Sequence, residues 1–152
     1  MRIADSKQMS PEEREESYAW LIENTVWGVG SVDAAEIDRI GILAATEIAM
    51  QQAVAQVGRT HRELYLLVDG RDAFWFDHPH SSIVRGDATE QCIAAASILA
   101  KVTRDRRMTE IDREVEAYGF ADHKGYGTSD HFEAIRTIGV SPFHRRSFLR
   151  NL

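Results

Sequence analysis

The first third of the chain combines one helical pattern with one strand-like pattern. Ser10 is a good N-cap, Pro11 suits the first helical position, and acidic residues follow in the first turn. These signals predict a helix from Pro11 to about Asn24. The next segment, residues 25–32, is rich in valine and glycine. It is predicted to be a strand whose glycines allow another backbone to come close.

Apolar residues at helical spacing mark three further segments. The sequence at 33–36 is an N-terminal capping pattern, and the apolar positions after it predict a helix over 34–57 that stops at Gly58. A long helix is predicted from Asp87 to about residue 117, with small residues that permit close packing on a sheet. A shorter helix is predicted over 129–138, between a glycine-punctuated loop and a basic tail.

Two short apolar runs read as strands rather than helices. Residues 64–68 are continuously apolar and end at Asp69-Gly70, which predicts a buried strand. A second short strand is predicted over 82–85. Strands that alternate with helices indicate an α/β layered domain. No repeat or linker divides the chain, so a single domain over residues 1–152 is expected.

Composition and charge narrow the class of protein. The chain has 152 residues, 43% of them hydrophobic and 28% charged, as in soluble globular domains. No apolar run approaches the roughly 18 residues of a membrane span, and the start has no signal-peptide pattern. The net charge of −6 argues against a protein that coats nucleic acid through bulk charge. Cys92 is the only cysteine, which fits a reducing cytoplasm and excludes an internal disulfide.

Two aspartates are candidates for chemistry because of where the predicted elements end. Asp69 follows a buried strand, where open α/β sheets place their ligands, although an Asp-Gly turn explains it equally well. Asp87 follows Gly86, and Glu90 lies three residues after Asp87. A helix N-cap at Asp87 with Glu90 at position N3 explains both acidic residues without any catalytic role. The two readings are compatible, because a capping carboxylate keeps lone pairs for a metal.

Other candidates are polar groups with commonplace alternatives. Ser97, Lys101 and Asp105 form a stripe on one helix face, which is either solvated surface or, through Lys101, a phosphate contact. Tyr126 stands between glycines, where an aromatic ring can stack on a base or sugar, or is an ordinary loop residue. The tail at 144–148 can contact phosphates or simply be solvated. Together these groups are compatible with metal-dependent phosphoryl chemistry.

Seven ordered sequence blocks give the chain a resemblance to the ribonuclease HII family over essentially its whole length. The most specific are AAASILAKVTRDRRM and YGFADHKGYGT. The blocks lie at residues 5–7, 36–54, 66–70, 85–88, 94–108, 118–128 and 144–148. The resemblance implies a ribonuclease H-like layered fold, with a central mixed sheet flanked by helices. It also implies cleavage of the RNA strand of RNA–DNA hybrids 5′ to a ribonucleotide, in replication or repair.

The resemblance also implies roles for particular residues. Asp69 and Asp87 correspond to two of the family's four catalytic, metal-binding carboxylates, with Arg85 replacing the usual lysine before the second. The implied cofactor is Mg²⁺ or Mn²⁺, hard ions that take carboxylate oxygens. Tyr126 corresponds to the tyrosine that recognises the junction ribonucleotide, and Lys7 and Lys101 are further substrate-binding candidates. The implied partner is a hybrid duplex, or DNA with embedded ribonucleotides, bound by a monomer away from membranes.

The sequence departs from the family at its start. The family's first strand carries an Asp-Glu-x-Gly-Arg-Gly motif with the other two carboxylates, whereas this sequence has no Asp-Glu dipeptide and only four residues before Asp5. The expectation is therefore an N-terminally truncated domain whose first two strands are missing and whose strand at 25–32 lacks its neighbour. Three functions stay open: an endonuclease, a non-catalytic hybrid-binding remnant, and an inactive fragment.

Overall fold

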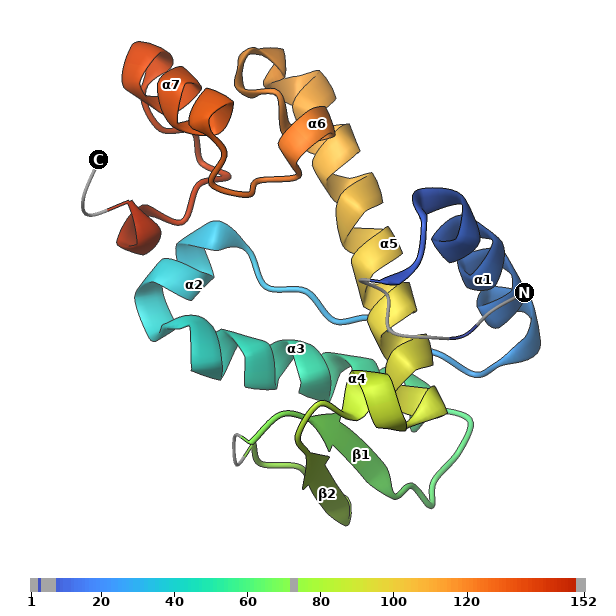
Figure 1. Cartoon of the computed structure of the whole chain (residues 1–152). Coiled ribbons are helices and arrows are strands. Elements are labelled where there is room, and N and C mark those ends of the chain that lie inside the picture. Colours follow the sequence, from blue (N-terminus) through green and yellow to red (C-terminus); the bar gives the residue numbers. More distant parts are fainter. Residues whose placement is uncertain (1–2, 4–7, 72–73, 150–152) are drawn as a thin grey trace. The chain divides into compact units, whose positions relative to one another are not determined.

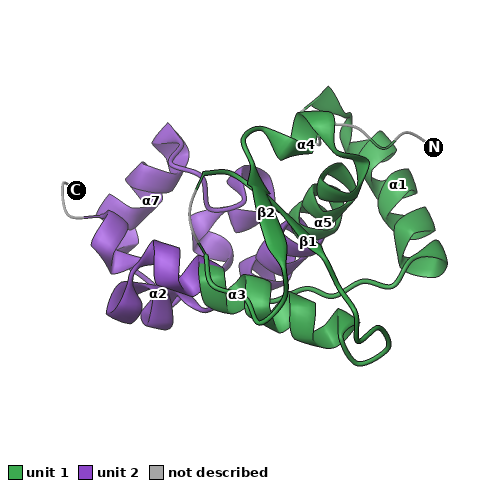
Figure 2. Cartoon of the chain, turned by 90° about the horizontal axis from the view of Figure 1, so that it is seen from below, with its two compact units in different colours: residues 1–31, 47–102 green, residues 32–46, 103–152 purple. Residues whose placement is uncertain are grey.

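The computed structural model describes residue 3, residues 8–71 and residues 74–149. The chain forms two compact units (Figures 1 and 2). The first combines residues 1–31 with 47–102, and the second combines 32–46 with 103–152. Each unit is therefore built from segments distant in sequence. The prediction of a single domain over 1–152 stays a prediction.

Helix α1, Pro11–Asn24, begins and ends where the sequence predicts. Ser10 and Glu13 form a reciprocal capping box: the Glu13 amide donates to Ser10 Oγ at 3.2 Å, and the Ser10 amide donates to Glu13 Oε2 at 2.8 Å. One face of α1 is buried against the first part of α5, Gln91–Glu114. The shared core consists of Met9, Tyr18, Leu21, Ile98, Leu99 and Val102.

The prediction of a strand at residues 25–32 is wrong, because this segment forms no ladder with another strand. Its backbone pairs instead with glutamine side chains of α3, Ile42–Val57. The Val29 amide donates to Gln56 Oε1 at 3.3 Å, while Gln56 Nε2 donates to the Val29 carbonyl at 2.8 Å. The Ser31 amide donates to Gln52 Oε1 at 3.0 Å. Two side-chain amides one helical turn apart thus take the place of a neighbouring strand.

The glycines of this segment do allow the close approach that the sequence predicts. A Cβ on Gly30 would lie 1.8 Å from the Ala49 carbonyl oxygen, and one on Gly28 would lie 2.5 Å from that of Ala53. The backbone therefore rests directly on the helix surface, and only glycine fits there. What the sequence pattern misidentifies is the partner, which is a helix rather than a strand.

The predicted helix over 34–57 is broken into two. Asp33 caps α2, Ala34–Ile40, by accepting the Glu36 amide at 2.8 Å, which confirms the capping pattern. Gly41 has φ +85° and ends α2, after which α3 begins. A positive φ lies outside the helical region and costs little at glycine. The break was not predicted because the apolar residues keep their helical spacing across Gly41.

The described residues contain a two-stranded parallel sheet, and most of the remaining elements are helical. Strand β1, Leu66–Asp69, pairs with β2, His80–Ile83, in a register that sets Asp69 opposite Ile83. The second strand thus lies two residues before its predicted position at 82–85. The expected central mixed sheet is represented in this part of the chain by this small sheet alone.

The long helix predicted from Asp87 is also divided. Helix α4, Gly86–Thr89, is a single turn that lies next to β1 (Figure 1), and Glu90 interrupts it with extended backbone before α5 begins. Helix α5 contributes its residues up to Val102 to the first unit and those from Thr103 onward to the second. No helix among the described residues is both long and apolar enough to cross a membrane.

The second unit gathers short elements around a small aromatic core. They are η2, Glu116–Tyr118; α6, Phe120–His123; α7, Ser129–Ile138; and η3, Arg146–Phe148. Helix α7 confirms the prediction for 129–138, and Thr128 caps it. Asp38 of α2 accepts the Arg146 and Ser147 amides at 2.7 and 2.9 Å. The basic tail is thereby fixed on the unit rather than free in solvent.

Substitution of Gly30 by alanine tests the close approach of residues 25–32 to α3. We expect Gly30→Ala to lower the free energy of unfolding by about 1–3 kcal/mol, because the new methyl group must displace the Ala49 carbonyl. Urea unfolding followed by circular dichroism measures the change. Gly58→Ala is the control, since its Cβ would have its nearest neighbour at 3.3 Å. Equal stability of the two variants would contradict the described packing.

Candidate functional site

Asp69 is placed by the parallel pairing of the two strands. It is the last residue of β1, and the Gly70 amide that follows donates to the Ile83 carbonyl at 2.9 Å, at the carboxyl end of β2. Parallel strands bring their carboxyl ends to one edge of a sheet, so the segment that follows β1 and the turn from β2 to α4 both start there. The predicted position of Asp69, at a strand end, is confirmed.

Asp87 reaches the same edge through a tight turn after β2. Arg85 adopts a left-handed conformation with φ 59° and is the N-cap of α4, and Asp87 lies within the first turn, 9% exposed. The prediction that Asp87 itself is the N-cap is therefore wrong. The physical reason is that the turn at Arg85 starts the helix earlier than the sequence pattern shows, which places Asp87 inside the helix in a buried position.

A hydrogen bond joins the two connections directly. The Gly86 amide donates to Asp69 Oδ1 at 2.8 Å. A side chain on Gly86 would place its Cβ 2.4 Å from Ile93 Cδ1 and 3.5 Å from the same Asp69 oxygen. Glycine at this position therefore lets the start of α4 come close to the end of β1, and it brings Asp69 and Asp87 to neighbouring positions.

The donor chemistry of this pair suits a hard divalent cation, but only in part. Mg²⁺ and Mn²⁺ prefer carboxylate oxygens, and a carboxylate that accepts one hydrogen bond retains further lone pairs. Within the described ranges, however, no group of three or more histidine, cysteine or acidic residues is arranged to hold a metal ion. The two aspartates at the strand edge are thus only part of the ligand set that a divalent cation needs.

Tyr126 belongs to the second unit, where it is 55% exposed at the surface. The guanidinium carbon of Arg104 lies 4.6 Å from the centroid of its ring, and Arg104 also donates to the Lys124 carbonyl at 2.8 Å. Lys124 and Gly125 both have positive φ, so the chain turns sharply just before the tyrosine. The ring is thereby presented to solvent beside a cation, an arrangement that can stack on a base and bind a phosphate.

Three histidines form a cluster next to the backbone of this tyrosine, and the sequence indicated only one of them, His144, as part of the basic tail. His131 and His144 are 6% and 7% exposed, and their Nε2 atoms lie 3.1 Å apart. The ring of His123 stacks on that of His131 with centroids 4.2 Å apart. These residues come from three separate segments, so no spacing in the sequence marks them as a cluster.

The two lysine candidates are not brought into a described site. Lys7 lies outside the described residues. Lys101 lies on α5 within the first unit and is partly buried. Both stay predictions that rest on the family resemblance.

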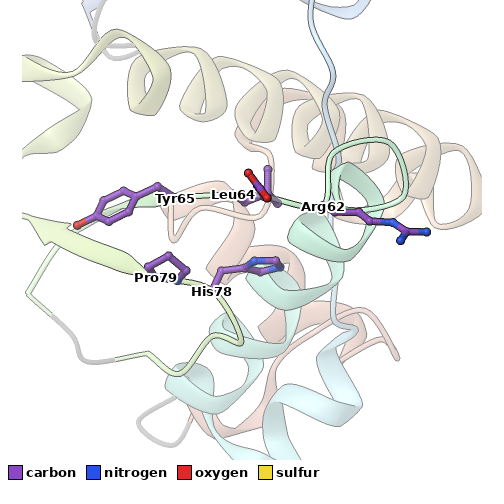
Figure 3. A pocket seen from close by; sticks show the side chains of 6 residues that line it. Arg62, Leu64, Tyr65, His78 and Pro79 are labelled. Atoms are coloured by element: carbon purple, nitrogen blue, oxygen red, sulfur yellow. The ribbon is translucent and has the colours of Figure 1, made fainter.

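A pocket in the first unit lies at the other end of the strands. It has a volume of about 490 Å³ and is lined by residues that lead into β1 and β2, as Figure 3 shows. These residues are Arg62, Glu63, Leu64, Tyr65, His78 and Pro79. They precede the strands, whereas Asp69 and Asp87 follow them, so this pocket is distinct from the carboxylate edge.

Comparison with solved structures identifies the fold. The chain superposes on the crystal structure of the ribonuclease H2 from Pyrococcus horikoshii OT3 with a TM-score of 0.68 and 23% sequence identity. The match covers 94% of this chain and 75% of the archaeal one. The architecture is therefore that of a ribonuclease H2.

Sequence comparison gives the family. Residues 1–151 match the family model described as Ribonuclease HII, and the chain belongs to this family. It is 44% identical to the ribonuclease HII of Clostridioides difficile and 50% identical to that of Geobacillus kaustophilus, over 99% and 96% of its own length. It spans 58% and 55% of those two relatives, and 76% of the one from Halorhodospira halophila.

Two substitutions of Asp69 separate its hydrogen bond from its charge. In EDTA we expect Asp69→Ala to lower the free energy of unfolding by about 1–3 kcal/mol, because the partly buried Gly86 amide loses its acceptor. Asp69→Asn keeps an oxygen at Oδ1 and should retain most of the stability. Urea unfolding of both variants measures this difference. Equal destabilisation by the two substitutions would show that the carboxylate charge, rather than the hydrogen bond, holds α4 in place.

Proposed function

We propose that this chain carries part of the active site of an endonuclease that hydrolyses the RNA strand of RNA–DNA hybrids, 5′ to a ribonucleotide. The observation that carries the proposal is the convergence of Asp69 and Asp87 at the carboxyl edge of the parallel strands, joined by the Gly86–Asp69 hydrogen bond. Membership of the ribonuclease HII family supports the same reaction and a divalent metal.

The two aspartates would hold a divalent cation at the strand edge. The chemistry that Mg²⁺ or Mn²⁺ supplies when bound there is charge neutralisation and activation of water. The Asp69 carboxylate is held in place by the Gly86 amide, and Asp87 is fixed within the buried first turn of α4, so both residues are positioned before a metal arrives. Positioning of this kind lowers the cost of assembling the site.

Tyr126 would recognise the ribonucleotide at the cleavage junction. Its exposed ring can stack on the sugar or base, and its hydroxyl can meet the 2′-OH that distinguishes RNA from DNA. Arg104 lies over the ring and would add a positive charge for the neighbouring phosphate. The acidic net charge of the chain makes such local cations necessary for binding a polyanion.

A second candidate, a hybrid-binding chain without catalysis, is favoured by one observation. The acidic residues within the described ranges form no metal-binding group of three. Two carboxylates alone hold Mg²⁺ weakly, because this ion dehydrates reluctantly. The distinction between the two functions is therefore whether further carboxylates join Asp69 and Asp87.

Cleavage assays with and without an added segment distinguish these functions. We expect the 152-residue chain alone to leave a DNA duplex with one embedded ribonucleotide uncut in Mg²⁺ or Mn²⁺. An N-terminal extension carrying a family-like Asp-Glu-x-Gly-Arg-Gly segment should produce cleavage 5′ to the ribonucleotide.

The control for this assay is the same extension with Asp69→Asn, which should abolish cleavage. Robust cutting by the chain alone would contradict the proposed need for further carboxylates. Cutting by the extended Asp69→Asn variant would contradict the role of Asp69. If the extended chain binds the duplex and never cuts it, the hybrid-binding function is correct.

A further inference from the structure

The histidines beneath Tyr126 form a hydrogen-bonded chain with a fixed direction. The Ser141 amide can only donate, and it points at His144 Nδ1 over 3.0 Å. Ser141 Oγ, which can donate or accept, lies 2.7 Å from the same nitrogen. An Nδ1 without a proton accepts from both groups, so we assign the His144 proton to Nε2. The Tyr126 carbonyl can only accept, and it lies 2.9 Å from His131 Nδ1, which must carry one. The 3.1 Å contact between the two Nε2 atoms then has one consistent polarity: His144 donates and His131 accepts.

His123 adds a second, independent link to the same loop. The Gly125 amide donates to His123 Nδ1 at 3.1 Å, and the opposite nitrogen, Nε2, lies 2.7 Å from the Tyr118 carbonyl. His123 is therefore neutral with its proton on Nε2. The amide of Gly125 and the carbonyl of Tyr126 are thus both bonded to imidazole rings.

We propose that His123, His131 and His144 are positioning residues that, as neutral rings of defined tautomer, hold the loop at residues 123–128 and so aim Tyr126. This inference rests on the proposed function, because that function gives Tyr126 a ribonucleotide to recognise. It assigns the histidines no contact with substrate. They act through the backbone on either side of the tyrosine.

The assigned neutral tautomers satisfy the neighbours of all three rings at once. A second proton on His144 would point Nδ1–H at the Ser141 amide hydrogen, with only Ser141 Oγ as acceptor, and a second proton on His131 would point Nε2–H at the proton of His144. The Phe120 ring packs against the cluster and lies within 5.7 Å of all three histidine rings, measured between centroids. This apolar contact and the burial of His131 and His144 favour the neutral imidazole over the charged form.

Burial favours the neutral form of His131 and His144. It is the largest cause that lowers the pKa of each ring, and repulsion between the charged forms of neighbouring histidines also lowers it, whereas a backbone hydrogen bond at Tyr126 or Ser141 raises it by less than burial lowers it. Among the described residues no carboxylate contributes to either shift. Tyr118 packs 4.8 Å from the His144 ring, with its hydroxyl on the Gly139 carbonyl, and the nearby Lys124 ammonium donates to Thr109 Oγ1 at 3.0 Å.

The direction of the pH effect follows from these lowered pKa values. In the unfolded chain His131 and His144 take up protons below pH about 6.5, whereas in the folded chain they do so only at a lower pH. The stability of the loop is therefore complete above pH 6.5 and is lost as the pH falls toward the folded pKa values. Acidification should release Tyr126 before it unfolds elements that lack buried histidines.

Nitrogen NMR of the histidine rings in the unmodified chain tests the proposal first. At pH 7.5 we expect two rings protonated at Nε2, His123 and His144, and one protonated at Nδ1, His131. A mixture of tautomers at any of these sites, or a charged ring at that pH, would overturn the proposal. This readout needs neither metal nor substrate.

Two variants of His131 test whether the link holds the loop. His131→Asn can still donate from near the Nδ1 position to the Tyr126 carbonyl, whereas His131→Leu cannot. We expect protection of the 125–128 amides from hydrogen exchange, corrected for intrinsic rates, to fall about tenfold or more in the leucine variant and to be largely kept in the asparagine variant. The same protection in the unmodified chain should fall between pH 7.5 and pH 5.5. Unchanged protection in the leucine variant, or at the lower pH, would overturn the proposal; if that variant does not fold, the asparagine variant and the pH series decide.

Binding of a DNA duplex with one ribonucleotide separates the positioning role from the proposed function. We expect Tyr126→Ala to weaken binding about fivefold or more, as the loss of one stacked ring does, and His131→Leu to weaken it in the same direction. If Tyr126→Ala binds normally, the proposed role of Tyr126 fails, while the exchange and tautomer results still decide whether the histidines hold the loop. If Tyr126→Ala weakens binding and His131→Leu does not, the positioning proposal is wrong.

Discussion

The parallel pairing of β1 with β2 is the constraint on which the candidate site depends. Parallel strands end at one edge, so the residues that follow them are neighbours although they are distant in sequence. The Gly86 amide links the start of α4 to the end of β1 by donating to Asp69. The left-handed turn at Arg85 then places Asp87 in a buried position in the first turn of α4. Without this register the two aspartates would be isolated surface acids.

Local signals predicted those parts of the fold that local energetics decide. The N-cap at Ser10, the cap at Asp33 and helix α7 all appear as predicted, because their stabilising hydrogen bonds lie within four residues. The segment at 25–32 failed because its partner is distant in sequence: glutamines of α3 satisfy its backbone in place of a strand. The breaks at Gly41 and Glu90 were missed because apolar spacing continues through them.

The same division between local signals and contacts distant in sequence applies to the candidate site. Asp69 could be recognised from an apolar run that ends in an acid, although of the strand it predicted only Val68 is buried. The cap assigned to Asp87 was wrong because the turn at Arg85 could not be predicted from spacing. The histidine cluster was missed, since only the fold brings α6, α7 and the segment at 141–144 together. Tyr126 was a candidate from its flanking glycines. The histidine hydrogen bonds that hold the backbone around Tyr126 could not be predicted from the sequence.

The most direct test of a carboxylate site at the strand edge is a titration of the isotopically labelled chain with Mn²⁺, followed by paramagnetic broadening of its amide signals. Residues next to the two aspartates, Gly70 and Ala88, should broaden first, and Asp69→Asn should remove that selectivity. Broadening that begins at other acidic residues, such as those at the start of α1, or that is unchanged by Asp69→Asn, would contradict a metal site formed by Asp69 and Asp87.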